Sequence, residues 1–132
     1  MPIHYQQKSN NPYRLPDNLY RRVLYTVKDY DRRKAEYYEL LEYVPPVLSG
    51  ISVNIDVSDP TANKAIKLAE ISGELHAVEA AAMMIDEPFR SAILRNLKYD
   101  EPLPFGDFSH RPTWYAKRRR FLYSVAVLLK LL

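Results

Sequence analysis

Cysteine is absent from this 132-residue chain, and only three glycines and three histidines occur in it. Without cysteine the chain can form neither disulfides nor thiolate zinc sites, and it has no thiol nucleophile. His4, His76 and His110 are not spaced for a shared metal site, and the glycines form no phosphate-binding loop. The sequence therefore predicts no catalytic residue, no metal and no cofactor, and we expect a protein that is not an enzyme.

Long hydrophobic runs are missing as well. No stretch approaches the roughly 18 apolar residues of a membrane-spanning helix, and the segment FLYSVAVLLKLL is interrupted by Lys130. The N-terminal MPIHYQQKSNNPYR has no apolar core, so it is not expected to act as a secretory signal. Hydrophobic residues make up 47% of the chain and charged residues 27%, as in ordinary globular proteins. We expect one cytoplasmic domain over residues 1–132, without a membrane partner.

A long first helix is predicted after a polar segment, residues 1–13, that is expected to be loose. Pro16 and Asp17 provide a helix start, and Pro45 and Pro46 provide a stop. Between them, apolar residues recur at steps of three, four or seven, which is the period of a helix with one buried face. These residues are Leu19, Val23, Val27, Tyr30, Tyr37 and Leu41.

A short strand is predicted near residues 51–57, where ISVNIDV alternates apolar and polar residues. The chain has no second convincing strand to pair with it. The segment is therefore either an extended arm on the surface or a strand that pairs with its own copy in a homodimer.

A second helix is predicted from SDPTA, where Ser58 or Asp59 can act as a cap, to Ile85. Its buried face is expected to contain Ala65, Leu68, Leu75, Val78, Ala82 and Ile85.

The remaining residues predict two more helices. DEPFRSAILRNL, residues 86–97, predicts a short third helix, and residues 98–110 contain two prolines and a glycine and predict a loop. The closing helix has Ser109 or Arg111 as candidate caps and Pro112 in its first turn. We therefore expect an all-α bundle of about four helices, with residues 14–85 forming a long-helix hairpin and residues 86–132 a second half.

Positive charge is concentrated at the end of the chain. The net charge of the whole chain is +3, yet residues 111–132 contain no acidic residue. Their six cations are Arg111, Lys117, Arg118, Arg119, Arg120 and Lys130. Residues 58–101, in contrast, hold five cations and eight acids. This asymmetry favours a polyanionic partner.

The closing helix is predicted to have one apolar and one basic face. Arg119, Arg120, Tyr123 and Lys130 fall on the accessible side, and Arg118 lies beside the apolar stripe, where it is expected to extend to solvent or pair with an acid of the second helix. The residues expected in the core are Trp114, Phe121, Leu122, Val125, Leu128, Leu129 and Leu132. A helix of this kind fits the major groove of DNA, although a solvated basic face, or binding to a membrane surface or an acidic protein, would produce the same pattern.

Three segments, LPDNLYRRVLYTVKDYDRRKAEY, SDPTANKAIKLAE and TWYAKRRRFLYSVA, together give the chain a recognisable pattern. From about Tyr13 to its end the chain resembles small phage and prophage late transcriptional regulators of the ArpU-like and RinA-like type. The C-terminal part of these regulators is similar to the helix-turn-helix of sigma-factor region 4. The resemblance implies a non-enzymatic protein that binds DNA sequence-specifically near a late promoter.

On this resemblance the helix that begins near Arg111 is the recognition helix, and Thr113, Lys117 and Arg120 are carried over as DNA contacts. The helical projection adds Arg119 and Tyr123. The full set of predicted DNA-binding residues is Arg111, Thr113, Lys117, Arg119, Arg120 and Tyr123.

The spacing of the last two predicted helices departs from a helix-turn-helix, whose helices are joined by three or four residues. Either the third helix serves as the first helix of the motif with a lengthened turn, or the motif has degenerated.

An alternative function is that of a small phage-encoded protein-binding module that inhibits or redirects a host protein. Its working surface would be the tyrosine-rich first helix, because tyrosine is common at interface hot spots. Not all five tyrosines of this helix can point into one core, so some are expected to be exposed. They are Tyr20, Tyr25, Tyr30, Tyr37 and Tyr38. Candidate partners are therefore double-stranded DNA, RNA polymerase or another host protein, and a second copy of the chain.

Overall fold

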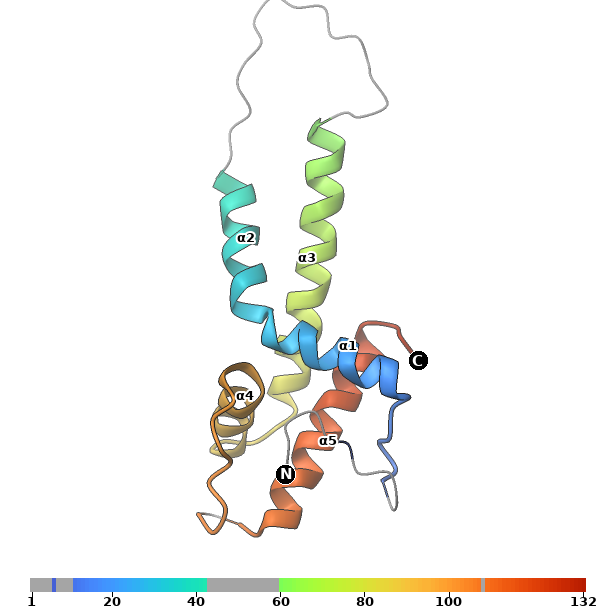
Figure 1. The fold of residues 1–132 in the computed structure, drawn as a ribbon. Helices are drawn as coiled ribbons and strands as arrows, with labels where there is room; N and C mark the ends of the chain where they lie inside the picture. The colour runs from blue at the N-terminus through green and yellow to red at the C-terminus, as the bar shows by residue number, and fades with distance from the viewer. Residues whose placement is uncertain (1–5, 7–10, 43–59, 108) are drawn as a thin grey trace, which may run out of the picture.

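Five helices make up most of the part of the chain that is described in this computed structural model, residues 6, 11–42, 60–107 and 109–132 (Figure 1). The helices are α1 (Asp17–Lys28), α2 (Tyr30–Glu42), α3 (Pro60–Met83), α4 (Phe89–Tyr99) and α5 (Arg111–Leu128). These residues contain no strand, and the predicted all-α class is confirmed. The strand expected near 51–57 and the expected caps Ser58 and Asp59 lie outside the described residues.

The prediction of one long first helix is wrong, because the chain turns at Asp29. Asp29 has φ −83° and ψ −1° and separates α1 from α2, although the hydrogen bonds Asp29 N to Tyr25 O (2.9 Å) and Arg33 N to Asp29 O (2.8 Å) span the turn. The two helices have different partners: α1 crosses α4 and α5, whereas α2 runs along α3 (Figure 1). One straight helix could not pack against α3 and also against α4 and α5. The spacing of apolar residues in the sequence continues unchanged through Asp29, so it does not indicate the turn.

The core lies where α1, α4 and the C-terminal half of α3 surround α5 (Figure 1). Its largest fully buried side chains include Trp114 and Phe121 of α5, and the Trp114 ring lies 4.5 Å from the ring of Phe89 in α4. Burial of large apolar side chains is the main stabilising contribution in such a bundle. The other core members are Leu15, Tyr20, Val23, Leu24, Val27, Val78, Ala81, Ala82, Ile85, Ala92, Ile93, Leu97, Leu103, Leu122, Val125 and Ala126.

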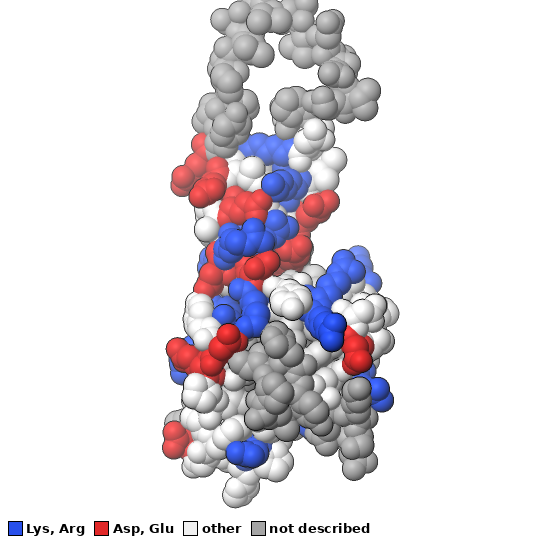
Figure 2. Space-filling view, in the orientation of Figure 1, with Lys and Arg blue, Asp and Glu red and all other residues white. Residues whose placement is uncertain are grey.

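The α2–α3 hairpin extends away from this core, and ion pairs join its two helices. Arg33 Nε donates to Glu74 Oε2 at 2.9 Å and Lys67 Nζ lies 3.0 Å from Glu36 Oε1. Positive and negative side chains alternate over the hairpin in Figure 2. None of the residues of α2 is fully buried, whereas Ile71 of α3 is fully buried outside the main core.

Two hydrogen-bonded groups near the turn have shifted pKa values. Burial and the hydrogen bond from Tyr30 to Glu79 (2.5 Å) raise the pKa of the Tyr30 hydroxyl. The Tyr99 hydroxyl donates to Asp31 and, together with Lys98 (Nζ to Oδ1, 2.9 Å), lowers the pKa of the Asp31 carboxyl. These contacts join the start of α2 to α3 and α4.

The predicted buried face of α3 is confirmed in its C-terminal half, where Leu75, Val78 and Ala82 are buried. Ile85 is buried as well, but it follows the helix, which ends at Met83, and Leu68 is half-buried. The prediction is wrong for Ala65, which is exposed, because the N-terminal end of α3 lies beyond the core. Two other residues expected in the core, Leu41 and Leu132, are also exposed, at 50% and 58%. Each lies at the end of its segment, beyond the elements that cover the middle.

Candidate nucleic-acid interface

Helix α5 is anchored by one face and open on another. His110 is its N-cap and Pro112 lies in its first turn, so the expected position of Pro112 is confirmed and the expected caps Ser109 and Arg111 are wrong. The first turn contains no acidic residue, and the free N–H groups and dipole of a helix start favour negative charge. The residues of α5 that are buried are Trp114, Arg118, Phe121, Leu122, Val125 and Ala126.

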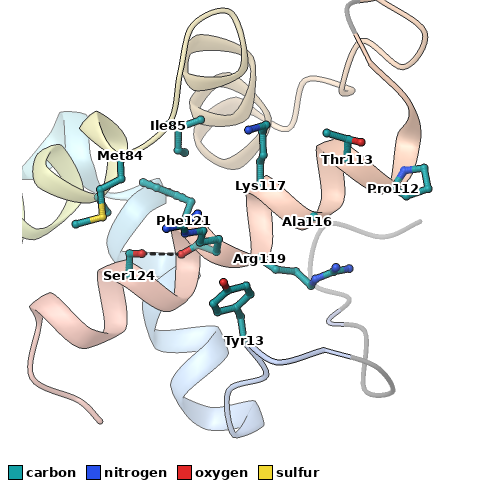
Figure 3. Close-up of a pocket in the computed structure, with 12 residues that line it drawn as sticks. Tyr13, Met84, Ile85, Pro112, Thr113, Ala116, Lys117, Arg119, Phe121 and Ser124 are labelled. Carbon is teal, nitrogen blue, oxygen red and sulfur yellow. Dashed lines mark hydrogen bonds between the residues drawn. The ribbon is translucent and has the colours of Figure 1, made fainter.

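The open face of α5 lies in a groove of about 550 Å³, named here the α5 groove (Figure 3). The end of α3 lies on one side of this groove and the segment before α1 lies on the other (Figure 3). The lining residues are Tyr13, Ala81, Met84, Ile85, Pro112, Thr113, Ala116, Lys117, Arg119, Arg120, Phe121 and Ser124. Three of these are cations and none is acidic, so the α5 groove favours an anionic ligand.

The structure brings four of the six predicted DNA-binding residues into this groove: Thr113, Lys117, Arg119 and Arg120. The other two lie beside it. Arg111 is exposed at the start of α5, with its guanidinium carbon 4.6 Å from the centre of the Phe105 ring. The half-buried Tyr123 ring packs edge-on against Tyr13, with 5.4 Å between the centroids.

Three cations of α5 form no ion pair, whereas seven other cations of the described residues do. Ion pairs with acids engage Lys28, Arg32, Arg33, Lys67, Arg90, Arg95 and Lys98. Within the described residues, Arg111, Lys117 and Arg120 form no ion pair. Lys117 instead lies over the Phe89 ring, with Nζ 4.7 Å from its centre, a placement that leaves the charge available to a ligand. These three charges are therefore not neutralised by neighbouring carboxylates.

Sequence reasoning missed the two sides of the α5 groove. Met84 and Ile85 come from the turn that follows α3, and Tyr13 comes from the segment before α1. These residues are far from α5 along the chain, and no local pattern relates them to it. Only the packing of α3 and of the N-terminal segment on α5 places them there.

Gln6, within the stretch that was expected to be loose, is hydrogen-bonded to Leu15. Gln6 Nε2 donates to the carbonyl of Leu15, and the N–H of Leu15 donates to Gln6 Oε1, both at 2.7 Å. Gln6 is buried and Leu15 belongs to the core. The expectation of a loose segment is therefore wrong for Gln6. The two hydrogen bonds between Gln6 and Leu15 anchor the chain two residues after Tyr13, which packs against Tyr123 of α5.

Arg118 of α5 is a buried cation that is hydrogen-bonded to α1 and α4. The expectation that it extends to solvent is wrong, since the residue is only 5% exposed. Its guanidinium donates to Asn96 Oδ1 of α4 and to the hydroxyl of Tyr20 in α1, both at 3.2 Å. Asn96 in turn donates to the carbonyl of Glu101 at 2.7 Å. Arg118 therefore helps to set the orientation of α5 relative to α1 and α4.

The connection between α4 and α5 spans residues 100–110, which is longer than the turn of a compact helix-turn-helix. Asp100 ends α4 in the left-handed conformation, with φ 59°, and Leu103 of the connection is buried in the core. The long connection is therefore packed against the bundle at Leu103.

Within the described ranges, no group of three or more histidine, aspartate or glutamate side chains is placed to hold a metal ion. None of the described helices is long and apolar enough to cross a membrane. Comparison of the chain with models of known protein families, with curated proteins and with solved structures found no match.

Proposed function

We propose that the protein binds double-stranded DNA through the open face of α5, as a non-enzymatic regulator of phage or prophage transcription. The observation that carries this proposal is the α5 groove. It collects Lys117, Arg119 and Arg120 without a single acidic lining residue, and among the described residues Lys117 and Arg120 form no ion pair. Phosphates supply the negative charge that such a surface lacks.

The residues of the α5 groove suit the two kinds of contact that DNA requires. Arginine and lysine bind phosphates or the edge of guanine, and a threonine hydroxyl binds a phosphate. The methyl groups of Thr113 and Ala116 can contact the methyl group of thymine. Arg111 and the start of α5 extend the same basic surface beyond the groove. The resemblance to ArpU-like and RinA-like regulators supports the same function.

The experiment that tests this function is selection of the purified protein against a random duplex DNA library at near-physiological salt, followed by sequencing of the retained DNA. An enriched motif is the expected result. A variant with Lys117→Glu and Arg120→Glu should lose both retention and the motif, because each substitution places a negative charge against phosphate. Absence of any motif with the wild-type protein would contradict a sequence-reading regulator.

Binding of a host protein through the tyrosines of α1 and α2 remains the alternative. Tyr25 and Tyr38 are 56% and 53% exposed, whereas Tyr20 is buried and Tyr30 and Tyr37 are half-buried. Two exposed rings on different helices make a smaller surface than five on one helix. The charge reversals at Lys117 and Arg120 separate the two functions, since a partner bound through α1 and α2 would still bind the reversed variant.

A further inference from the structure

The face of α2 around Tyr38 has exposed apolar side chains and borders a hollow between α2 and α3. Tyr38 is 53% exposed and Leu41 is 50% exposed. Both belong to α2, which contributes no residue to the lining of the α5 groove. A helix with a stripe of exposed apolar side chains gains stability when another element covers that stripe.

Two charges flank Tyr38 at equal spacing. Lys34 lies four residues before Tyr38 and Glu42 lies four residues after it. At 100° per residue, these three residues and Leu41 lie within an arc of about 100° of the helix surface. Both Lys34 and Glu42 are exposed, and neither forms an ion pair within the described part of the chain.

Two other charged residues in the middle of α2, Arg33 and Glu36, form ion pairs within the hairpin. Arg33 and Glu36 bind each other at 2.9 Å and also bind Glu74 and Lys67 of α3. The inner side of α2 is thus neutralised within the hairpin. Among the described residues, the exposed charges of α2 without an ion pair are Lys34, Glu39 and Glu42. Of these, Lys34 and Glu42 are placed symmetrically about Tyr38.

We propose that this face forms a homodimer, in which α2 packs antiparallel against α2 of a second copy with Tyr38 on the twofold axis. In that register, a residue a given number of positions after Tyr38 in one copy faces the residue the same number of positions before Tyr38 in the other copy. Lys34 then faces the partner's Glu42, and Glu42 faces the partner's Lys34. Leu41 faces the partner's Ala35, which is also an exposed apolar residue.

A second copy fits this face better than an unrelated partner because a twofold interface must be complementary to itself. The pattern Lys34, Tyr38, Glu42 becomes complementary to itself when it is reversed. A uniformly acidic or basic partner would instead place a like charge against one end. Lys34 and Tyr38 also line the hollow of about 240 Å³ between α2 and α3. The interface needs no residue of the 51–57 segment and does not depend on DNA binding.

A cysteine cross-link tests the register. The chain contains no cysteine, so Tyr38→Cys introduces a single thiol that lies opposite its own copy. On oxidation, the full-length Y38C chain should run largely as a covalent dimer on a non-reducing gel. The matched control is Tyr25→Cys, another tyrosine that is 56% exposed, but in α1, and it should remain monomeric. Equal cross-linking of the two variants, or none in either, would overturn the proposal.

Charge exchange tests the ion pairs, with dimerisation measured by sedimentation equilibrium over a concentration series. Lys34→Glu and Glu42→Lys should each weaken the dimer by about tenfold, since each places like charges together twice in a twofold interface. The double variant should regain the wild-type dissociation constant to within about threefold, because it restores both pairs. A wild-type protein that is monomeric throughout would overturn the proposal, as would a dimer that the single reversals leave unchanged. Circular dichroism establishes that the variants are folded, and the Y38C result stands independently if one of them is not.

Discussion

The salt dependence of DNA binding gives the sharpest test of the α5 groove. The perturbation is the removal of two positive charges, Lys117→Gln and Arg120→Gln, without the introduction of any negative charge. Both side chains line the groove, and within the described residues neither forms an ion pair. Their removal should therefore alter the response to salt while sparing the ion pairs of the fold.

The magnitude follows from the number of cations that can reach phosphate. Each neutralised phosphate contributes about 0.9 to the slope of the logarithm of affinity against the logarithm of salt concentration. If Arg111, Lys117, Arg119 and Arg120 each contact one phosphate, the wild-type slope is about −3.6, and affinity falls roughly 150-fold between about 50 and 200 mM salt. The variant retains two contacts, so its slope is about −1.8 and its affinity falls only roughly 12-fold.

The assay is fluorescence anisotropy with a labelled duplex across that salt range. The matched control replaces Arg22 and Lys130 with glutamine, because these exposed cations line a different groove between α1, α3 and the end of the chain. The control should retain the wild-type slope, although it loses the same net charge. A groove variant that keeps the wild-type slope, or a control that changes the slope equally, would contradict phosphate contacts by Lys117 and Arg120.

Two further predictions concern the fold that supports the groove. Arg118→Ala should lower the free energy of unfolding, measured in urea, by about 3 kcal/mol, because it leaves a void and removes the donor to Asn96 and Tyr20. A loss below about 1 kcal/mol would show that Arg118 is not needed to hold α5. Asp31 has a lowered pKa in the folded state, with the hydrogen bond from Tyr99 as its main cause. Its stabilising contribution is therefore present above its unfolded pKa of about 3.9 and is lost as the pH falls through the lower folded value. The stability difference between the wild type and Asp31→Asn should shrink below about pH 4 in unfolding experiments, and a difference that stays constant with pH would contradict this role.

Much of the fold could be predicted from the sequence because helix signals are local. Pro16 and Asp17 mark the start of α1, and Pro112 marks the first turn of α5. The apolar spacing in α5 identified Trp114 and Phe121 as core residues, and both are fully buried. These features depend on a few neighbouring residues and on the period of the helix.

The turn at Asp29 was not predictable in this way, because the apolar period runs through it unchanged. The chain turns there since α1 and α2 pack against different helices, which is a property of the assembled bundle. The burial of Arg118 has the same origin: its neighbours in sequence are exposed or half-buried cations, and the acceptors that make burial tolerable come from α1 and α4.

The sequence by itself determined that α5 has a basic face with no acidic residue, because composition and helical period are local properties. Only the tertiary structure decided that this face lies in a groove between Tyr13 and Met84, and that Gln6 is hydrogen-bonded to Leu15. These residues come from segments far apart in the chain, and they meet only because the burial of α5 draws the end of α3 and the N-terminal segment onto it.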